Sequence, residues 1–512
     1  MGFVMKWMQS KLPLICCSIG TMCLSACRTA DTRTTTPSAT SVFRESTVIR
    51  HSETESSAVV PLASGTEAFV ARLALASRAK KTLDLQYYIW RGDKTGRLLA
   101  GAVVEAAERG VKTRMLLDDM GTAAKDRSLL ILDSHPNIEV RLFNPIGLRS
   151  MRMLGTLLDF GRVNRRMHNK SFTVDSQVAI VGGRNIADEY FDASDAMNFA
   201  DFDVVVRGPA VDEVGDTFEQ YWSCEAAIPI TQVSSEKVSD ADLQAGRREL
   251  LAHRKQMEDS KYAAALKSSK LANTPLNQIT FLKGRAVVVS DRPEKVKMRP
   301  EDASTHLAPL LRGVVAATQR ELTLVSPYFI PGKEGVQWMT ELEQRGVNVK
   351  VITNSLASTD VAPVHSGYAR YREDLLKAGI EIRELKPMPT ATQSDKGLNL
   401  TGSSKAGLHA KTFVFDRRWV FVGSMNLDPR SLRLNTEMGI VIDSTELATM
   451  MLERAESKLS QRTYLVKNGP DGLTWTTEEN GQLMTLKKEP SGGLKKSIVK
   501  MIASWLPIEG QL

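Results

Sequence analysis

Two segments of the chain, one in each half, carry the same side chains at the same spacing. Both follow the pattern H-x-K-x4-D-x6-G-x-x-N. The two sets are His168, Lys170, Asp175, Gly182 and Asn185 in the first half, and His409, Lys411, Asp416, Gly423 and Asn426 in the second. A single chance match in a chain this long has odds on the order of one in ten thousand. Two matches therefore indicate a duplicated functional unit.

These residue types suit the transfer of a phosphodiester group. The two lysines, with the amide hydrogens of Asn185 and Asn426, can bind the non-bridging oxygens and stabilise charge that develops on them. One imidazole can attack phosphorus while the other protonates the leaving alcohol and then deprotonates the incoming acceptor. We therefore expect a two-step reaction through a phosphohistidine that uses both motif histidines. We also predict that the two motif aspartates are catalytic residues.

A nucleophilic imidazole must be held in one tautomer, which calls for a carboxylate on its far nitrogen. The candidates are Glu437, in Asn-Thr-Glu, and Asp201, in the corresponding Ala-Asp-Phe-Asp segment. Surface or structural roles are the alternative for both. We expect neither a metal ion nor a cofactor, because the lysines already neutralise the phosphate and neither motif has a ligand spacing such as H-E-x-x-H or paired cysteines.

The residues around each motif predict the elements that position it. Valine and phenylalanine make each H-x-K segment a strand, and side chains at i and i+2 of a strand share a face, so each histidine and its lysine point the same way. The aspartates come where the chain must turn, and the apolar runs 178–181 and 420–422 are the expected returning strands. Gly182 and Gly423 are expected to bend the backbone so that the two asparagines reach the same face.

Upstream of each motif the chain repeats a strand–helix–strand pattern, which favours parallel pairing. We expect an α/β fold of two similar lobes. Each is predicted as a mixed, mostly parallel sheet flanked by helices, with one active site at the pseudo-two-fold interface. The predicted parts are lobe 1 (61–230), a polar connector (231–275), lobe 2 (276–465) and a C-terminal tail (466–512).

The N-terminus has the features of an export signal. Lys6 and Lys11 precede an apolar run that ends on Leu-Ser-Ala-Cys, which resembles a bacterial lipobox with Cys27 as the lipidated residue. An ordinary signal peptide with an incidental cysteine is the alternative. We expect residues 1–27 to be the lipoprotein signal and 28–60 a flexible tether. Cys224 is then the one cysteine of the body, so no disulfide can form within the mature chain.

The motifs are those of the phospholipase D superfamily, and longer stretches closely resemble bacterial cardiolipin synthases. These stretches are LDLQYYIW (83–90), RRMHNKSFTVD (165–175), VGGRNI (181–186), ITNSLASTDVAPVHSGYAR (352–370), LHAKTFVFD (408–416) and VGSMNLDPRSLRLNTEMG (422–439). The similarity runs from about residue 62 to 465 and returns at LKKEPS (486–491).

The resemblance implies that a phosphatidyl group passes to a histidine and then to the glycerol headgroup of phosphatidylglycerol. It implies attack by His168 and acid/base work by His409. It also implies a hydroxyl contact from Ser424 to phosphate, which Gly183 cannot provide on the other side. The donor, phosphatidylglycerol or phosphatidylethanolamine, does not follow from these residues, and neither does an accessory protein. We expect a monomer, anchored to a bacterial envelope membrane and facing the periplasm.

Other segments have two interpretations each. Residues 149–166 mix apolar and arginine side chains. The segment could form a lip that faces the membrane, or a helix packed on its own lobe. A C-terminal amphipathic helix around 494–505 is interfacial or docked on the core. His365 lines the pocket or is structural. Tyr87, Tyr88 and Trp90 are assigned to the core, not to the site.

The net charge of the chain favours a class of binding partner but does not identify a single one. There are 67 Lys and Arg against 59 Asp and Glu, a net charge of +8, which favours an anionic membrane or nucleic acid. A lipid tether and an apolar lip fit a nuclease poorly, so nucleic acid is not expected as a partner. The competing functions are a phosphodiesterase that hydrolyses phospholipid or nucleic acid, in which water or a nucleotide hydroxyl replaces the lipid acceptor, and a non-catalytic membrane-bound binding protein.

Overall fold

The structure is a computed structural model that describes residues 56–122, 126–195, 197–387, 406–457 and 459–490. The predicted signal peptide with Cys27, the tether up to residue 55 and the C-terminal helix around 494–505 lie outside the described residues.

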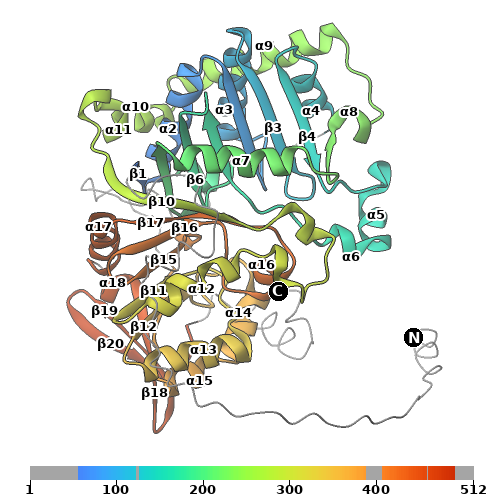
Figure 1. Ribbon diagram of the computed structural model, residues 1–512. Helices are drawn as coiled ribbons and strands as arrows, with labels where there is room; N and C mark the ends of the chain where they lie inside the picture. The colour runs from blue at the N-terminus through green and yellow to red at the C-terminus, as the bar shows by residue number, and fades with distance from the viewer. Residues whose placement is uncertain (1–55, 123–125, 196, 388–405, 458, 491–512) are drawn as a thin grey trace, which may run out of the picture. The chain divides into compact units, whose positions relative to one another are not determined.

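The first half is built on an eight-stranded stretch of sheet in the order β1-β8-β6-β5-β2-β3-β4-β9. The strands are β1 (Ser57–Leu62), β2 (Thr82–Tyr87), β3 (Lys112–Asp118), β4 (Ile138–Phe143), β5 (Ser171–Val174), β6 (Val178–Gly182), β8 (Asp203–Arg207) and β9 (Ala227–Pro229). Helices α2 (Gly65–Arg78), α3 (Lys94–Glu108) and α4 (Asp126–Asp133) pack on one face, and α7 (Ala210–Trp222) lies on the other (Figure 1).

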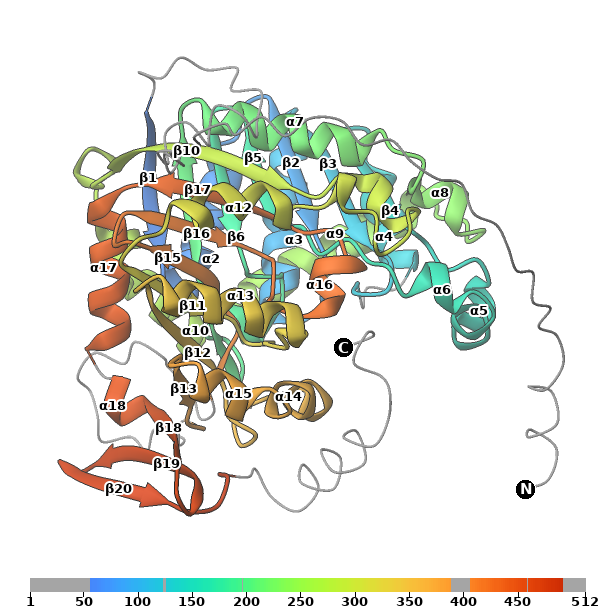
Figure 2. The same cartoon turned by 60° about the horizontal axis from the view of Figure 1, so that its bottom comes forward.

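The second half repeats this order as β10-β17-β16-β15-β11-β12-β13 and extends it with β18-β19-β20. The strands are β10 (Leu282–Ser290), β11 (Glu321–Val325), β12 (Asn348–Asn354), β13 (Glu381–Leu385), β15 (Lys411–Phe415), β16 (Trp419–Gly423), β17 (Met438–Asp443), β18 (Thr463–Gly469), β19 (Gly472–Glu479) and β20 (Gln482–Leu486). Its helices are α12 (Ala308–Ala317), α13 (Gly332–Gln344), α14 (Ala362–Ala369), α15 (Arg372–Lys377), α16 (Pro429–Arg433), α17 (Thr445–Glu456) and α18 (Leu459–Arg462) (Figure 2).

The expected mixed α/β lobes are present, but their sheets are not mostly parallel. Among the described strands of these two sheets, parallel pairs occur within β2-β3-β4 and within β11-β12-β13, and the other pairs are antiparallel. For β5-β6 and β15-β16 the reason is that each motif strand returns through a tight turn, which can join only antiparallel neighbours.

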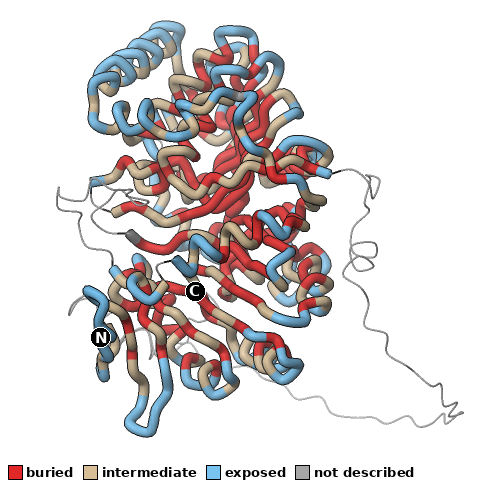
Figure 3. The backbone as a smooth tube through the Cα atoms, turned by 90° about the vertical axis from the view of Figure 1, so that its left-hand side faces the viewer, coloured by how far each residue is buried: buried red, intermediate tan, exposed pale blue. Residues whose placement is uncertain are grey.

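The two halves share sheet and core. β1 pairs with β8 of its own half and, at Ser57 to Val59, with β10 of the second half, so one sheet continues across both. Alternate residues of the returning strands serve different cores: Ile180 and Phe421 pack within their own halves, whereas Val181 and Val422 meet in a core that both halves build. Figure 3 shows the buried strands through the middle of the fold and exposed residues on the outer helices.

Two of the predicted boundaries fall within strands. The boundary at 60/61 cuts β1, and the boundary at 465/466 cuts β18, which pairs with β13 and makes residues up to Leu486 part of the second half. The connector 231–275 is mostly helical: α8 (Ile230–Val233), whose first residue precedes the connector, then α9 (Asp240–Met257), α10 (Lys261–Ser268) and α11 (Lys270–Asn273). The connector packs on α2 and α3. It therefore covers part of the first half in addition to linking the two halves.

Candidate active site

His168 is fixed by the second half of the chain. Its backbone N–H donates to the carbonyl of Thr436 at 2.8 Å, and the amide of Thr436 donates back to the carbonyl of Arg166. Its imidazole Nδ1 lies 2.8 Å from Oε2 of Glu437, the residue after Thr436. Backbone and side chain of this histidine are therefore held by two consecutive residues of the other half.

His409 is fixed in the same way by the first half. Its N–H donates to the carbonyl of Ala200 at 2.9 Å, next to the short parallel pair of β7 (Asn198–Ala200) and β14 (Ala406–Leu408). Its Nδ1 lies 2.7 Å from Oδ2 of Asp201, the residue after Ala200. The reciprocal arrangement has the pseudo-two-fold relation that the repeated motif implies.

Both carboxylates are suited to orient the imidazoles. Burial alone would raise the pKa of each carboxyl, but the adjacent histidine lowers the pKa of both Glu437 and Asp201 below its ordinary value. An ionised carboxylate can only accept, so Nδ1 of each imidazole carries the proton and Nε2 keeps its lone pair. Each ring therefore keeps an unprotonated Nε2 for nucleophilic or acid/base work, and Nε2 of His409 lies within hydrogen-bond distance of Lys411.

Burial favours the neutral form of both imidazoles. Burial lowers the pKa of His168 to about 4, where Glu437 opposes the shift and Lys170 adds to it. Burial likewise lowers the pKa of His409 to about 3, with Lys411 as the next cause. The lysine of the other motif also lowers the pKa of each histidine, so both motifs lie within one electrostatic environment.

The lysines are buried beside their histidines. Nζ of Lys170 donates to the carbonyl of His168 at 2.6 Å, and Nζ of Lys411 lies 3.2 Å from Nε2 of His409. Burial lowers the pKa of Lys170 to about 7 and that of Lys411 to about 8, against the opposing effect of the carboxylates. Desolvated ammonium groups of this kind interact strongly with a phosphate anion.

The structure does not bring Asp175 and Asp416 to the histidines, although they were predicted as catalytic. Each lies at the hairpin turn after its motif strand, with a φ of 52° and 50°, respectively. The Asp175 carboxylate accepts from the backbone amides of residues 80–82, and Asp416 accepts from those of 319–321. These aspartates fasten the hairpin to the start of the neighbouring strand, because a carboxylate at a turn satisfies amides that the sheet leaves open.

The predicted phosphate ligands are mostly occupied in other ways. Asn185 accepts from the amide of Ile89 at 3.1 Å and donates to the hydroxyl of Tyr190 at 2.9 Å, which leaves one amide hydrogen for a ligand. Asn426 has a buried Oδ1 without a hydrogen-bond partner among the described residues. The hydroxyl of Ser424 donates to Glu437, so its predicted contact to phosphate is corrected to support of the carboxylate.

The Ser424 and Gly183 positions differ for a steric reason. A Cβ added at Gly183 would lie 2.3 Å from Oδ1 of Asp201. The shorter acid brings its carboxylate close to the backbone and fills the space that a serine would take. Glycine in one half therefore goes with aspartate, and serine in the other half goes with the longer Glu437.

Aromatic rings flank both imidazoles. Tyr88, which the sequence analysis assigned to the core, meets His168 edge-on with ring centroids 5.0 Å apart, and Lys170 lies 5.5 Å from the centre of its ring. Tyr190 and Phe199 lie 5.0 and 5.1 Å from the ring of His409. Tyr190 and Phe199 gave no signal in the sequence, because neither belongs to the repeated motif.

Further residues support Glu437 and were missed. Ser431 donates its hydroxyl to Oε1 of Glu437 at 2.7 Å, and buried Asp291 accepts from the Glu437 amide at 2.7 Å. Lys295 bonds both Asp291 and the carbonyl of Ser431. A helix start at Asp428-Pro429 was readable from the sequence, and it places Ser431 in the first turn of α16.

His365 is structural. Its ring is buried between the carbonyl of Asn354 and the carboxylate of Glu489, which also pairs with Arg372. It thereby ties the segment after β20 to α14. Among the described residues there is no cluster of three or more metal-ligating side chains.

No helix within the described ranges is both long and apolar enough to cross a membrane.

The site can be set beside known proteins. Residues 73–222 and 311–459 match the family described as "Cardiolipin synthase, PLD-like domain". Cardiolipin synthase C of Escherichia coli (strain K12) is 43% identical over 455 residues, which is 88% of this chain and 95% of that protein. Cardiolipin synthase B of the same strain is 25% identical over 74% of this chain and 75% of its own length.

Among solved structures, phosphatidylserine synthase of Haemophilus influenzae Rd KW20 has the same fold. It superposes with a TM-score of 0.53 over 80% of this chain and 87% of that chain, at 15% identity. Fold, repeated motif and family match agree on the two duplicated regions. The chain belongs to the cardiolipin synthase family of phospholipase D-like proteins.

Proposed function

We propose that the protein is a cardiolipin synthase, a phosphatidyltransferase that moves a phosphatidyl group from a donor phospholipid to phosphatidylglycerol through a phosphohistidine. The observation that carries the proposal is the pair of buried imidazoles, each held at Nδ1 by a carboxylate of the other half and each with a lysine beside it. The 43% identity to cardiolipin synthase C supports the choice of substrate class.

In the first step Nε2 of His168 attacks phosphorus. An N–P bond forms, the P–O bond to the donor headgroup breaks, and the leaving alkoxide takes a proton from Nε2 of His409. Lys170 and Lys411 neutralise the non-bridging oxygens as charge grows on them. The phosphate anion also favours the charged form of His409, which is how a histidine of low pKa acquires the proton that it donates.

In the second step the primary hydroxyl of phosphatidylglycerol replaces the leaving headgroup. His409 takes the hydroxyl proton, the oxygen forms a new P–O bond and the N–P bond breaks, which restores His168. The products are cardiolipin and free glycerol or ethanolamine, depending on the donor. Water in place of the lipid hydroxyl would give phosphatidic acid, so exclusion of water decides between transferase and hydrolase.

The proposed location follows from the substrates and from the N-terminal sequence. Both donor and acceptor are membrane lipids. A lipid on Cys27 would hold the catalytic halves at the surface of a bacterial envelope membrane, facing the periplasm.

The test incubates the purified protein with phosphatidylglycerol vesicles, with and without phosphatidylethanolamine, and follows lipids and released headgroups by mass spectrometry. We expect cardiolipin with an equal amount of glycerol or ethanolamine. His168→Ala and His409→Ala should abolish it. His253→Ala, on α9 and outside the site, is the matched control and should leave it unchanged.

Two outcomes would contradict the proposal. Phosphatidic acid without cardiolipin would make the protein a hydrolase. Unchanged turnover in His168→Ala would remove the phosphohistidine.

A further inference from the structure

Exposed apolar side chains gather on one short segment that leads to His168. The segment comprises a 3-10 turn (Arg149–Met151), α5 (Arg152–Leu158) and α6 (Phe160–Val163). Its exposed large apolar residues are Leu148, Met151, Met153, Leu154, Leu157, Leu158 and Phe160. Met153 is 90% exposed, and Leu157 and Leu158 are 74% and 71% exposed. Soluble proteins rarely leave such a patch in water unless it binds something.

We call residues 148–160 the apolar crest, and ion pairs and close packing hold it on the first half. Arg149 pairs with Asp119 and Asp126, and Arg152 pairs with Asp119. An added Cβ at Gly155 would lie 3.0 Å from Ile146, which reflects close packing on the underside. The exposed side chains therefore belong to a fastened element, and Figures 1 and 2 place α5 and α6 at the edge of the first half.

Arginines accompany the apolar crest, and four of them also pair with carboxylates. Residues 148–166 contain five arginines and one aspartate. Arg152 and Arg162 are partly exposed, and Arg165 donates to the carbonyl of Met298, itself an exposed apolar residue. Apolar side chains bordered by arginines complement a bilayer with anionic headgroups.

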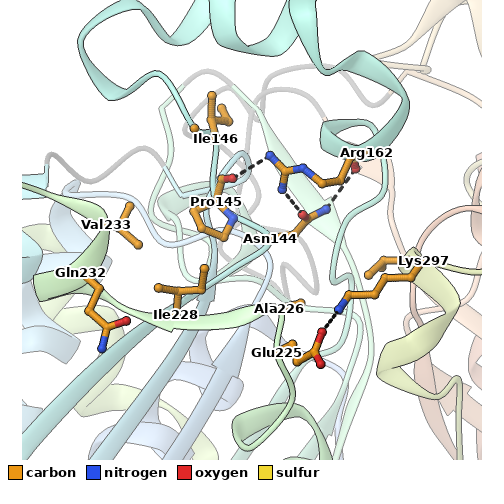
Figure 4. Close-up of a pocket in the computed structure, with 12 residues that line it drawn as sticks. Asn144, Pro145, Ile146, Arg162, Glu225, Ala226, Ile228, Gln232, Val233 and Lys297 are labelled. Atoms are coloured by element: carbon orange, nitrogen blue, oxygen red, sulfur yellow. Dashed lines mark hydrogen bonds and ion pairs between the residues drawn. The ribbon is translucent and has the colours of Figure 1, made fainter.

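A pocket of about 400 Å³ adjoins the crest (Figure 4). Pro145, Ile146, Ile228 and Val233 line one side. Arg162, bonded to Asn144 and Pro145, and Lys297, paired with Glu225, lie on the other side. The pocket therefore has an apolar side and a polar side, on which Arg162 pairs with Asp159 and Lys297 pairs with Glu225.

We propose that residues 148–160 are a membrane-docking surface, which inserts its exposed methionine and leucine side chains into an anionic phospholipid bilayer. The proposal rests on the proposed function, because the lipids that the proposed reaction uses lie in the bilayer and the crest precedes His168 by eight residues in the sequence. After the crest the chain is held again at Arg166 to His168, which form a bridge and backbone hydrogen bonds with Thr436.

The first test labels the full-length protein with an environment-sensitive dye, in a background in which all five native cysteines are replaced with serine. The dye is placed at Leu157→Cys or, as the matched control, at Leu251→Cys, an exposed leucine on α9. With phosphatidylglycerol vesicles we expect a blue shift at position 157 and quenching by lipid-borne quenchers, and no change at position 251. Neutral phosphatidylcholine vesicles should give a smaller response. No response at position 157 with vesicles that are turned over would overturn the proposal.

The second test replaces Met153, Leu157 and Leu158 with serine. Turnover of vesicle phosphatidylglycerol should fall by about tenfold or more, since three apolar side chains no longer enter the bilayer. Turnover of short-chain phosphatidylglycerol dispersed in detergent should stay within about twofold, as it should for Leu251→Ser on both substrates.

The two proposals fail differently. An absence of cardiolipin from either substrate in the unmodified protein would refute the proposed function. Equal losses on both substrates would refute docking alone. A change of molecular mass by sedimentation in the triple variant, with vesicle turnover unchanged, would mean that the crest is a protein–protein interface and would also refute docking.

Discussion

The two imidazoles have unequal surroundings although their motifs are alike. Glu437 is held by two hydroxyl groups, whereas Asp201 is held by the backbone amide of Phe202. One aromatic ring adjoins His168 and two adjoin His409. These unequal surroundings allow the two imidazoles to differ in reactivity, as the proposed roles of nucleophile and acid would use.

The division of labour can be tested with a phosphatidyl donor that carries p-nitrophenol as its headgroup. This leaving group needs no proton, so His409→Ala should still release one equivalent of nitrophenol in a burst and retain a phosphohistidine. His168→Ala should show no burst. Stopped-flow absorbance and mass spectrometry of the trapped protein measure both. A burst in His168→Ala alone would reverse the roles.

The lysine pKa values predict an alkaline limit to activity. Burial lowers the pKa of Lys170 to about 7 and that of Lys411 to about 8, so both lose their charge as the pH rises through these values. The histidines stay neutral down to about pH 4. We therefore expect kcat/KM to fall between about pH 7 and 8. Lys170→Arg should extend the plateau upward, because a guanidinium keeps its charge. A flat profile to pH 9 would contradict this.

The close approach of Asp201 to Gly183 predicts the effect of substitutions at these two positions. Gly183→Ser alone should lower kcat by about tenfold or more, because the new side chain displaces Asp201 from His409. Gly183→Ser with Asp201→Glu should recover part of the loss, since it reproduces the pair of the other half. Steady-state kinetics of both single variants and the double variant give the coupling. Additive losses would show that the two positions act independently.

At the scale of elements, the hairpin is the unit that presents each histidine. Its turn aspartate accepts three backbone amides, which together lower the pKa of Asp175 although burial opposes this. The group is ionised at neutral pH, and the stability that it contributes is lost as the pH falls through its lowered pKa. The hairpin thus depends on residues remote from the imidazoles.

Asp175→Asn should therefore destabilise the fold without removing the chemistry. We expect a loss of about 1–3 kcal/mol in the free energy of unfolding, because charge-assisted bonds to several amides are weakened. The kcat of the folded protein should change by no more than about threefold. Denaturant titration and active-site-normalised rates measure this, with Asp416→Asn as the symmetric companion. Lost kcat at unchanged stability would return these aspartates to the catalytic set.

Local sequence predicts some elements and not others. The spacing of His168 and Lys170 is enough to place both on one face, because it depends only on the geometry of a strand. It cannot show that Ser424 bonds Glu437, 13 residues away, or that Tyr88 turns towards the site, since both depend on tertiary packing. The antiparallel pairing around the motif strands, and the addition of β18 to the second sheet, also depend on contacts between distant segments.

At the scale of the whole molecule, neither half has a complete site. Each histidine takes its carboxylate from the other half, and β1 and the shared core join the two. A change at the interface between halves should therefore affect both imidazoles at once.

Mixing His168→Ala with His409→Ala tests whether one chain holds the whole site. We expect no recovery of activity in the mixture, because both halves of each chain already face each other and have no reason to exchange. Cardiolipin formation after co-expression and after mixing of the purified variants measures this. Recovery to about a quarter of the unmodified rate would mean that halves swap between chains.

The reciprocal supply of carboxylates also bears on the history of the site. A symmetric dimer of one half would satisfy the same need, because each subunit of such a dimer gives its partner what it receives. Joining two copies in one gene ends the requirement that they stay identical. The two halves of this chain differ in a paired way: Glu437 accepts from the hydroxyl of Ser424, whereas Asp201 occupies the space that a side chain at Gly183 would need. Unlike a symmetric dimer, the single chain can therefore hold its two imidazoles in different surroundings.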